Sequence, residues 1–445
     1  MKNNIKATIT IGDNENISGV LEKKDDNYVF KSWSCENYNV SPRSNLYGKT
    51  HDTNRISLLD CFGDKHSYSR NNEYTYGSEI HPFLVVTGID YIYPDSDKFK
   101  TITMSVSNPE KLIILLSSFG YINTPSKKLI EALNEMNTTP EFEDGFYPVI
   151  AYYNGKNNVV RQETNLGLIN IRNNVSYGMD GKSSGVEIKN NLSVEIHFQT
   201  PVDIKEALSR ASRIALFLRF IGGEGLFFDK ISITKENCND YYGEYKVHDS
   251  SNCWGKDLAE IENKFPLINI ANNHFLTVLK SWFDAEGRDE ARYRFYDTFF
   301  NSDYSSERLI IAANMFEFLP KLTSEKQSLR DRINERLDII NNQLDKRNLS
   351  RSNLDFIVDK AIKARNYFVH GTKYKKLTID QLYSFLPLFI GTLEYIYAIS
   401  ELVEAGLDLE HIGQESSYHK VSEYVLVINS QFEILESAIN ENSSS

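Results

Sequence analysis

The residues best suited to chemistry lie together near the end of a predicted helix. The segment Arg365-Asn-Tyr-Phe-Val-His370-Gly371 places a guanidinium and an imidazole five positions apart. Histidine, with an ordinary pKa of about 6.5, takes or gives a proton near neutral pH, and arginine can stabilise the charge of a phosphorane. This pair suits the cleavage of RNA, in which the neighbouring 2′-hydroxyl is the nucleophile and no metal ion is needed.

The helix that carries this pair is predicted to begin with a Ser352–Asp355 cap and to end at Gly371. At about 100° per residue, Arg365 falls inside the apolar stripe of this helix. A guanidinium there is costly unless it is paired or opens into a cleft. The predicted stripe consists of Leu354, Ile357, Val358, Ala361, Ile362, Phe368 and Val369.

The two chemical groups do not share one face of an ideal helix. Asn366 and His370 are four positions apart and lie on an adjacent face, whereas Arg365 and His370 differ by about 140°. They converge if the end of the helix bends, or if two copies of the helix meet across a two-fold axis. We expect Asn366 to orient the imidazole or to donate to phosphate.

Basic and aromatic residues follow the pair directly. Lys373, Lys375 and Lys376 are placed to hold a phosphate backbone, and Tyr367 to stack on a base. The alternative is purely structural: an arginine that extends from the helix edge to water, and a histidine that interacts with the C-terminal end of the helix.

Charge is distributed unevenly along the chain, whose formal net charge is −12. From Lys321 to Lys376 there are 14 Lys or Arg against 7 Asp or Glu, whereas from Glu401 onward there is one Lys against 9 acids. A globally acidic protein is a poor general binder of nucleic acid, but a local basic stretch can hold one phosphate backbone. The alternative is that these charged residues simply lie on the solvent-exposed faces of long helices.

Two other patterns that could indicate a ligand-binding site are incomplete in this sequence. Gly181-Lys182-Ser183 lacks the upstream glycine of a phosphate-binding loop. Cys238, His248 and Cys253 supply three soft ligands, but a structural zinc site takes four. We therefore predict no metal and no cofactor, and reduced thiols in an intracellular protein.

The composition indicates a folded protein of two or three domains. The chain has 445 residues, of which 41% are hydrophobic and 12% aromatic, which excludes overall disorder. The N-terminus lacks the apolar segment of a signal peptide, and the most apolar run, Phe385 to Ile399, is short and contains Glu394. We expect a cytoplasmic protein that does not bind a membrane.

The period of the apolar residues changes along the chain, which predicts an α+β protein of two parts. Residues 1–250 read as a β-rich region and residues 256–445 as an all-α bundle, with a polar linker over 240–254. One long helix, Asp203 to Phe220, is expected inside the β-rich part. The helices expected in the second part are Ala271–Ala285, Glu290–Phe300, Glu307–Phe318, Gln327–Leu344, Asn353–His370 and Ile379–Val403.

The residues Arg365 to Gly371, at the end of a late helix in an all-helical region, resemble the RxxxxH signature of the HEPN ribonuclease superfamily. The Ala312–Pro320 segment and the Ile379–Val403 helix also fit its bundle. Together with the β-rich first half and its Ile17-Ser-Gly-Val-Leu21 pattern, the chain looks most like the ApeA-type anti-phage defence proteins.

This resemblance implies a metal-independent endoribonuclease that acts as a homodimer, with Arg365 and His370 of both copies lining one cleft and Glu317 as an acidic helper. It implies that RNA, with transfer RNA as a candidate, is cut to halt translation and abort infection, in response to an unknown phage-derived trigger. The β-rich part would sense that trigger or restrain the nuclease. Two alternatives remain: a bundle that binds a nucleotide or a protein without cutting, and a structural adaptor.

Overall fold

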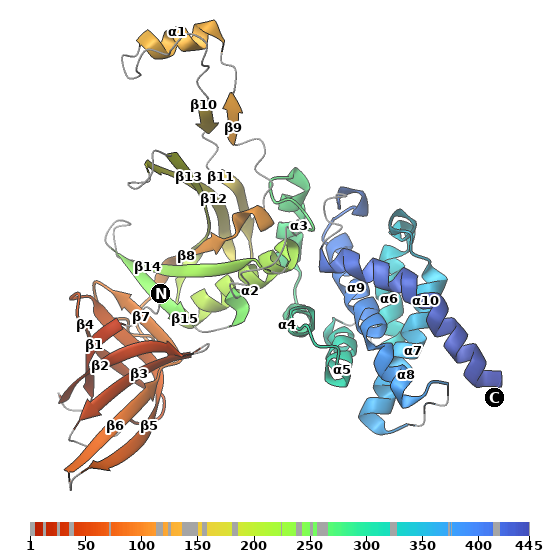
Figure 1. Ribbon diagram of the computed structural model, residues 1–445, viewed down its shortest axis with the longest axis horizontal. Helices are drawn as coiled ribbons and strands as arrows, with labels where there is room; N and C mark the ends of the chain where they lie inside the picture. The colour runs from red at the N-terminus through yellow and green to blue at the C-terminus, as the bar shows by residue number, and fades with distance from the viewer. Residues whose placement is uncertain are drawn as a thin grey trace.

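The computed structural model confirms the α+β architecture in two parts, β-rich first and helical second (Figure 1). It describes residues 5–11, 15–24, 27–34, 40–70, 73–112, 119–122, 126–135, 150–153, 158–179, 186–223, 225–236, 243–249, 252–255, 266–320, 327–372, 374, 376–412 and 419–444. The strands come first, and from residue 273 onward the described elements are all helical.

The first six strands close into an antiparallel barrel. Each strand pairs with two others, in the order β5-β4-β1-β2-β3-β6, and β6 pairs back to β5. Side chains such as Ile9, Phe30 and Ile56 fill its interior. The strands are β1 (Ile5–Ile11), β2 (Glu15–Lys24), β3 (Asn27–Ser34), β4 (Ser44–Thr50), β5 (Arg55–Arg70) and β6 (Glu73–His81).

The strand β5 belongs to the barrel and also to a second, open sheet. Its residues 55–59 pair with β7, and from Phe62 onward it pairs with β6. Asp60 lies between the two stretches with φ of 52°, a left-handed conformation that kinks the strand. The open sheet continues through β7 (Leu84–Gly88), β15 (Glu244–Asp249), β14 (Phe227–Lys235), β8 (Phe99–Ser107), β13 (Val186–Val202), β12 (Gly167–Met179) and β11 (Asn158–Thr164).

The open sheet differs from the prediction at one point. The polar stretch 240–254 was predicted to be a linker, and this is wrong because β15 lies within it and pairs with both β7 and β14. A separate extension carries β9 (Phe119–Ile122), α1 (Lys127–Glu135) and β10 (Ile150–Tyr153), and it projects from the sheet in Figure 1.

The helix α2 (Ile204–Gly222) covers one face of the open sheet, where it contacts β8, β13 and β14. The prediction of this helix is confirmed. Its N-cap is Asp203, whose side chain accepts from the backbone N–H of Glu206, and it ends at Gly223, where φ is 77°.

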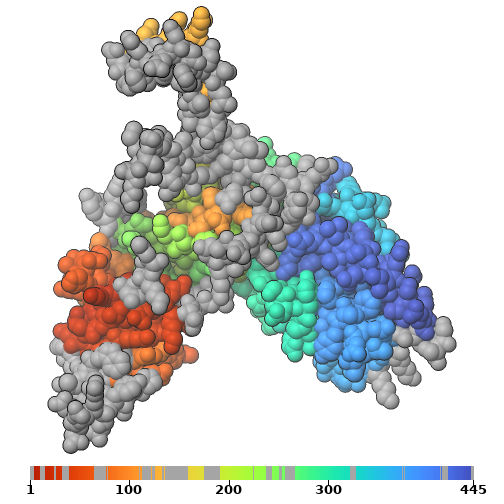
Figure 2. Space-filling view, in the orientation of Figure 1, coloured from red at the N-terminus to blue at the C-terminus, as the bar shows by residue number. Residues whose placement is uncertain are grey.

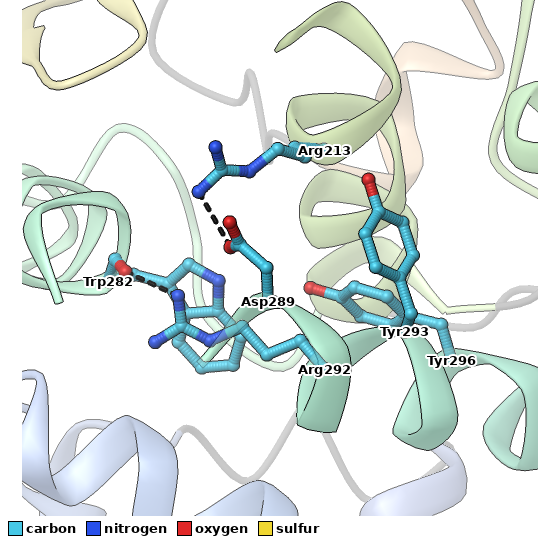
Figure 3. A pocket seen from close by; sticks show the side chains of 6 residues that line it. All are labelled: Arg213, Trp282, Asp289, Arg292, Tyr293 and Tyr296. Carbon is cyan, nitrogen blue, oxygen red and sulfur yellow. Dashed lines mark hydrogen bonds and ion pairs between the residues drawn. The ribbon is translucent and has the colours of Figure 1, made fainter. Parts of the chain in front are cut away.

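An aromatic cluster joins α2 to the helical part. Phe217 lies 4.9 Å from Trp282 between ring centroids, and Phe220 lies 5.1 Å from Phe295. Next to this cluster, Arg213 of α2 points at Asp289, the first residue of α4 (Asp289–Phe299), 2.7 Å away, while the Arg292 guanidinium lies against Trp282 (Figure 3). The sheet, α2 and the helical part therefore share one continuous core, although the barrel and the helices diverge on the face shown in Figure 2.

The helical part contains eight helices among the described residues. Three of them, α8, α9 and α10, differ from the prediction. The expected helix Ile379–Val403 is broken at Phe385, since Pro387 cannot donate a backbone hydrogen bond at that point, and the last helix was not predicted. The helices are α3 (Asn273–Asp284), α4 (Asp289–Phe299), α5 (Ser306–Asn314), α6 (Leu329–Ile340), α7 (Arg351–His370), α8 (Ile379–Ser384), α9 (Leu386–Glu404) and α10 (Lys420–Ser444).

Helix α9 is the centre of this bundle. It is long and apolar enough to cross a membrane by length and composition alone, but nearly all of it is buried against other helices, as in the core helix of a bundle. It contacts α3 to α8 and α10.

Two carboxylates of α9 are buried, seven positions apart and so on nearly the same face. Glu394 accepts from Arg308 of α5 at 2.9 Å and from the hydroxyl of Tyr424 of α10. Glu401 accepts from Arg288, Arg292 and Arg336. The corresponding nitrogen–oxygen distances for Glu401 are 2.6, 3.0 and 2.8 Å.

We predict that Glu401→Gln lowers the free energy of unfolding by about 3–5 kcal/mol, because it leaves the buried Arg292 without its counter-charge and leaves Arg288 and Arg336 to share Glu404. Urea denaturation followed by circular dichroism measures this. The matched control is Glu410→Gln, whose exposed carboxylate pairs with Lys346 and whose loss should cost less than about 1 kcal/mol. Equal effects of the two variants would contradict the prediction.

A second prediction concerns acid stability. Burial by itself raises the pKa of Glu404, but hydrogen bonds and charge from Arg288 and Arg336 outweigh it and lower the pKa from 4.5 to about 2. Glu404 therefore stabilises the fold above pH 4.5 and loses this contribution as the pH falls toward 2. The difference in melting temperature between wild type and Glu404→Gln should be largest at pH 6 and should shrink steadily as the pH falls from 4.5 toward 2; a constant difference would refute this.

Candidate active site at the end of helix α7

Helix α7 carries the predicted chemical pair, and its start differs from the prediction. It begins at Arg351, one residue before Ser352, and its N-cap Ser350 makes no capping bond through its side chain. The predicted Ser352–Asp355 cap is therefore wrong. Asp355 instead accepts from Arg351 at 3.0 Å and from Arg330 of α6 at 3.2 Å, which ties α7 to α6.

The apolar stripe of α7 is largely as predicted. Leu354, Ile357, Val358 and Ala361 are buried, together with Ala364. Val369 is the exception at 41% exposed, because it lies in the last turn, beyond the packed part of the helix.

Arg365 sits in a polar cluster between three elements. Its Nη2 donates to Oδ1 of Asn314, the last residue of α5, at 3.1 Å, and its Nη1 donates to Oδ1 of Asn366 at 3.2 Å. The same Nη2 lies 3.6 Å from Oε1 of Glu317, in the 3-10 turn that follows α5. The side chain of Arg365 is 16% exposed and that of Glu317 is 45% exposed, so the cluster opens to solvent on the Glu317 side.

The structure thus brings the side chains of Arg365, Asn366 and Glu317 together. It adds Asn314, which the sequence analysis did not select. Asn314 lies 51 positions from Arg365, and no local pattern marks it. The only available signal was its position three residues before Glu317, which puts both side chains near one side of a helical turn.

A buried arginine holds the turn that carries Glu317. Nη1 of Arg332, at the start of α6, donates to the backbone oxygens of Phe316, Glu317 and Leu319 at 3.1, 2.9 and 3.0 Å. Arg332 is only 7% exposed. This contact fixes the backbone of the turn without touching the Glu317 side chain, so Arg332 positions the cluster.

His370 does not reach this cluster within one chain. It is the last residue of α7 and is exposed, and α7 is a continuous α-helix up to it. The helix then ends because Gly371 adopts φ of 63° while its N–H still donates to the carbonyl of Tyr367. The bend that would bring His370 to Arg365 is therefore not present, and convergence of the two groups requires a second copy.

The side chain of Asn366 is turned toward Arg365, since its Oδ1 accepts from that guanidinium. It makes no hydrogen bond to His370 within the described part of the chain. An amide whose oxygen is held in this way presents its Nδ2 hydrogens to an incoming acceptor. This arrangement fits the predicted donation to phosphate better than the predicted orientation of the imidazole.

The predicted RNA-binding residues have different outcomes. Lys373 and Lys375 lie outside the described residues, and Lys376 is exposed. Tyr367 is half-buried, with its ring 5.3 Å from that of Phe368 in an edge-to-face contact. Stacking of a base on Tyr367 would therefore have to use the exposed part of its ring.

Part of the basic surplus between 321 and 376 is buried or pairs with carboxylates outside the stretch. Arg332, Arg336 and Lys360 are buried. Arg336 pairs with Glu401 and Glu404 of the acidic stretch, and Lys346 pairs with Asp408. The basic surface near α7 is therefore less extensive than the charge count indicates.

The alternative zinc set is not assembled by the described residues. Nε2 of His248 lies 3.3 Å from the Thr87 hydroxyl, and burial followed by the charges of Lys246 and Lys23 lowers its pKa. Cys253 is half-buried and Cys238 lies outside the described residues. No group of three or more His, Cys, Asp or Glu in the described part of the chain is arranged to hold a metal ion.

Comparison with known proteins identifies a family for the first part of the chain. The family model described as ApeA N-terminal domain 1 matches residues 3–282, well over half of the chain. This span contains the barrel, the open sheet, α2 and nearly all of α3, and it ends before α4. No curated protein and no solved structure matches. The matched span does not include the Arg365 cluster.

We predict that Arg332→Met destabilises the protein by about 2–4 kcal/mol, because three buried carbonyls lose a charged donor. It should also weaken the link between Glu317 and Arg365. Chemical denaturation measures the first effect. The matched control is Arg330→Met on the same helix, where a partly exposed pair with Asp355 is lost and the cost should stay below about 1 kcal/mol. A loss no larger than that of the control would show that Arg332 does not hold the turn.

Proposed function

Since the chain belongs to the ApeA N-terminal domain 1 family, which supports a role in anti-phage defence, we propose that it is a metal-independent endoribonuclease of the HEPN type. RNA, with transfer RNA as the candidate class, is its substrate, and cleavage blocks translation in the infected cell. The protein acts in the cytoplasm, and its β-rich part responds to a phage-derived trigger.

One observation carries the catalytic part of this proposal. A largely buried arginine is held in a solvent-facing polar cluster by Asn314, Asn366 and Glu317, on the same helix as an exposed histidine. An arginine fixed in this way is already oriented toward solvent and loses little conformational freedom when it binds an anion. The structural alternative, an arginine reaching freely to water from the helix edge, fits these contacts less well.

The residues have distinct roles in the proposed reaction. His370 removes the proton of the ribose 2′-hydroxyl, whose oxygen attacks the adjacent phosphorus. Arg365 and the Asn366 amide donate to the non-bridging oxygens, where negative charge develops. The bond from phosphorus to the 5′-oxygen breaks, and that oxygen takes a proton from a second imidazolium. The products are a 2′,3′-cyclic phosphate end and a 5′-hydroxyl end.

The proposed active unit is a homodimer. One chain offers its arginine cluster and its histidine on different faces of α7, so two antiparallel copies of the helix end supply both groups to one phosphate. Apolar side chains around that end are exposed: Val369, Ile379 and Tyr383 are 41%, 56% and 51% exposed. These side chains offer an apolar surface for the second copy.

The second candidate function is a bundle that binds a nucleotide or a protein without cutting. The Arg365 cluster favours it to this extent: both terminal nitrogens of the guanidinium already have acceptors in the resting protein. This function predicts saturable binding that raises the melting temperature, without turnover.

The test is cleavage of transfer RNA and of total RNA in EDTA by wild type, Arg365→Ala and His370→Ala. Each variant should lose at least about 100-fold in rate, because each removes a group that acts on the reacting phosphate. The matched control is Lys363→Ala on an exposed turn of the same helix, which should cleave like wild type. Mapping of the ends should find 2′,3′-cyclic phosphates.

Full cleavage by both active-site variants would exclude this site. If wild type is inactive in buffer, the assay is repeated in extract of phage-infected cells, which contains the trigger. Persistent inactivity together with RNA-induced stabilisation would favour the binding module. Light scattering on the same samples should give the mass of a dimer, and a monomer that cleaves would contradict the composite cleft.

A further inference from the structure

Two adjacent residues of the turn that follows α5 are exposed beside the Arg365 cluster. Glu317 belongs to that cluster, and Phe318 is the next residue, with 43% of its surface exposed. Both lie in the 3-10 turn Met315–Phe318, whose first two residues are buried. The turn therefore presents a carboxylate and an aromatic ring to solvent, next to the guanidinium that is proposed to bind the reacting phosphate.

The backbone that carries these two side chains is fixed. Arg332 donates to three carbonyls within residues 316–319, and these carbonyls lie on both sides of Phe318 in the chain. A ring on a backbone that is already held loses little conformational freedom when a ligand packs on it. Phe318 is therefore better prepared to bind a flat ligand than a ring on a flexible loop would be.

A second arginine packs on the Phe318 ring. The guanidinium of Arg294, in α4, lies over this ring with its central carbon 5.1 Å from the ring centroid. Arg294 also pairs with Glu290, one turn earlier in the same helix, at 3.0 Å. A guanidinium that has its own counter-charge thus covers part of the ring, and the exposed part remains for a ligand.

The charges around Phe318 favour a base over a phosphate. Glu317 lies beside the ring in the chain, and Glu290 pairs with the arginine that covers it. Asp297 belongs to the same helix, and the charge of Arg294 lowers its pKa against the larger effect of burial. These carboxylates would repel a phosphate. A nucleobase is uncharged, stacks on aromatic rings and is recognised through hydrogen bonds at its edge.

We propose that Phe318 and Glu317 bind the base of a nucleotide next to the scissile phosphate, and that they prefer cytosine, which has an amino group, to uracil. The base stacks on Phe318, and its amino group donates to the carboxylate oxygen of Glu317 that does not face Arg365. Uracil has a carbonyl oxygen where cytosine has its amino group, and the carboxylate repels that oxygen. The proposal rests on the proposed nuclease function, because it takes the phosphate to lie at Arg365.

The first test is the base preference of cleavage. Two short RNAs are compared that differ only in cytosine or uracil at both nucleotides flanking the cut mapped for wild type. Wild type should cleave the cytosine RNA at least about fivefold faster, because a hydrogen bond to a charged group is lost with uracil. Glu317→Gln should bring this ratio close to one, since an amide offers both a donor and an acceptor. Phe318→Ala should raise KM about tenfold for both RNAs.

The matched control is Tyr304→Ala. Tyr304 is 44% exposed and lies under the guanidinium of Arg308 at 4.9 Å, before the other end of α5. Its loss should change neither KM nor the ratio between the two RNAs. Circular dichroism checks that each variant is folded.

A second readout does not need cleavage. Phe318→Trp places an indole at the proposed stacking site, and 2′-O-methyl oligocytidylate is the probe, because it lacks the attacking hydroxyl. Its binding should quench the emission that this variant adds to that of wild type, with about fivefold higher affinity than 2′-O-methyl oligouridylate.

The outcomes separate the two proposals. RNA cleavage that depends on Arg365 but shows the same base ratio in wild type and Glu317→Gln, or an unchanged KM in Phe318→Ala, overturns the base site and leaves the nuclease standing. Oligonucleotide binding without quenching in Phe318→Trp does the same. Absence of both cleavage and oligonucleotide binding overturns the nuclease and the base site together.

Discussion

The helical part depends on the neutralisation of two carboxylates inside its central helix. Glu394 and Glu401 lie in the buried helix α9, and an unpaired charge there would cost several kcal/mol. Their arginine partners come from the elements around α9, so the charges can be paired only when these elements have docked. Helix α5 is positioned through Arg308, and α5 ends in Asn314, which holds Arg365. The geometry of the candidate site therefore follows from ionic contacts far from it.

The elements that sequence analysis predicted well are those defined by local signals. Asp203 and Gly223 mark the ends of α2 because capping and positive φ are properties of a few adjacent residues. Closure of the barrel was not predictable in this way, since it rests on pairing of β6 with both β3 and β5. The break at Phe385 could have been predicted from Pro387, which is visible in the sequence. It was missed because the surrounding apolar residues indicate one continuous helix.

The residues of the candidate site show the same difference between local signals and long-range contacts. Arg365 and His370 could be selected because their types and spacing form a short motif. Asn314 and Arg332 could not, because each acts across more than ten residues on a partner in another element. The charge pattern was the most misleading signal. A surplus of lysine and arginine over 321–376 suggested a basic surface. Arg332 instead donates to backbone carbonyls and Arg336 pairs with Glu401, so neither contributes to such a surface.

Helix α2 has a mechanical consequence. Its first turns line a groove beside the barrel, and its last turns carry Phe217 and Phe220 into the aromatic cluster on which α3 and α4 pack. A helix of 19 residues is a rod about 28 Å long. Because α2 packs on the open sheet and its last turns pack on α3 and α4, a rigid tilt of the helix would displace both contacts together. Any mechanical coupling between the β-rich part and the helical part through α2 then depends on the rigidity of this helix. A more flexible centre of α2 would weaken that coupling while leaving each part folded.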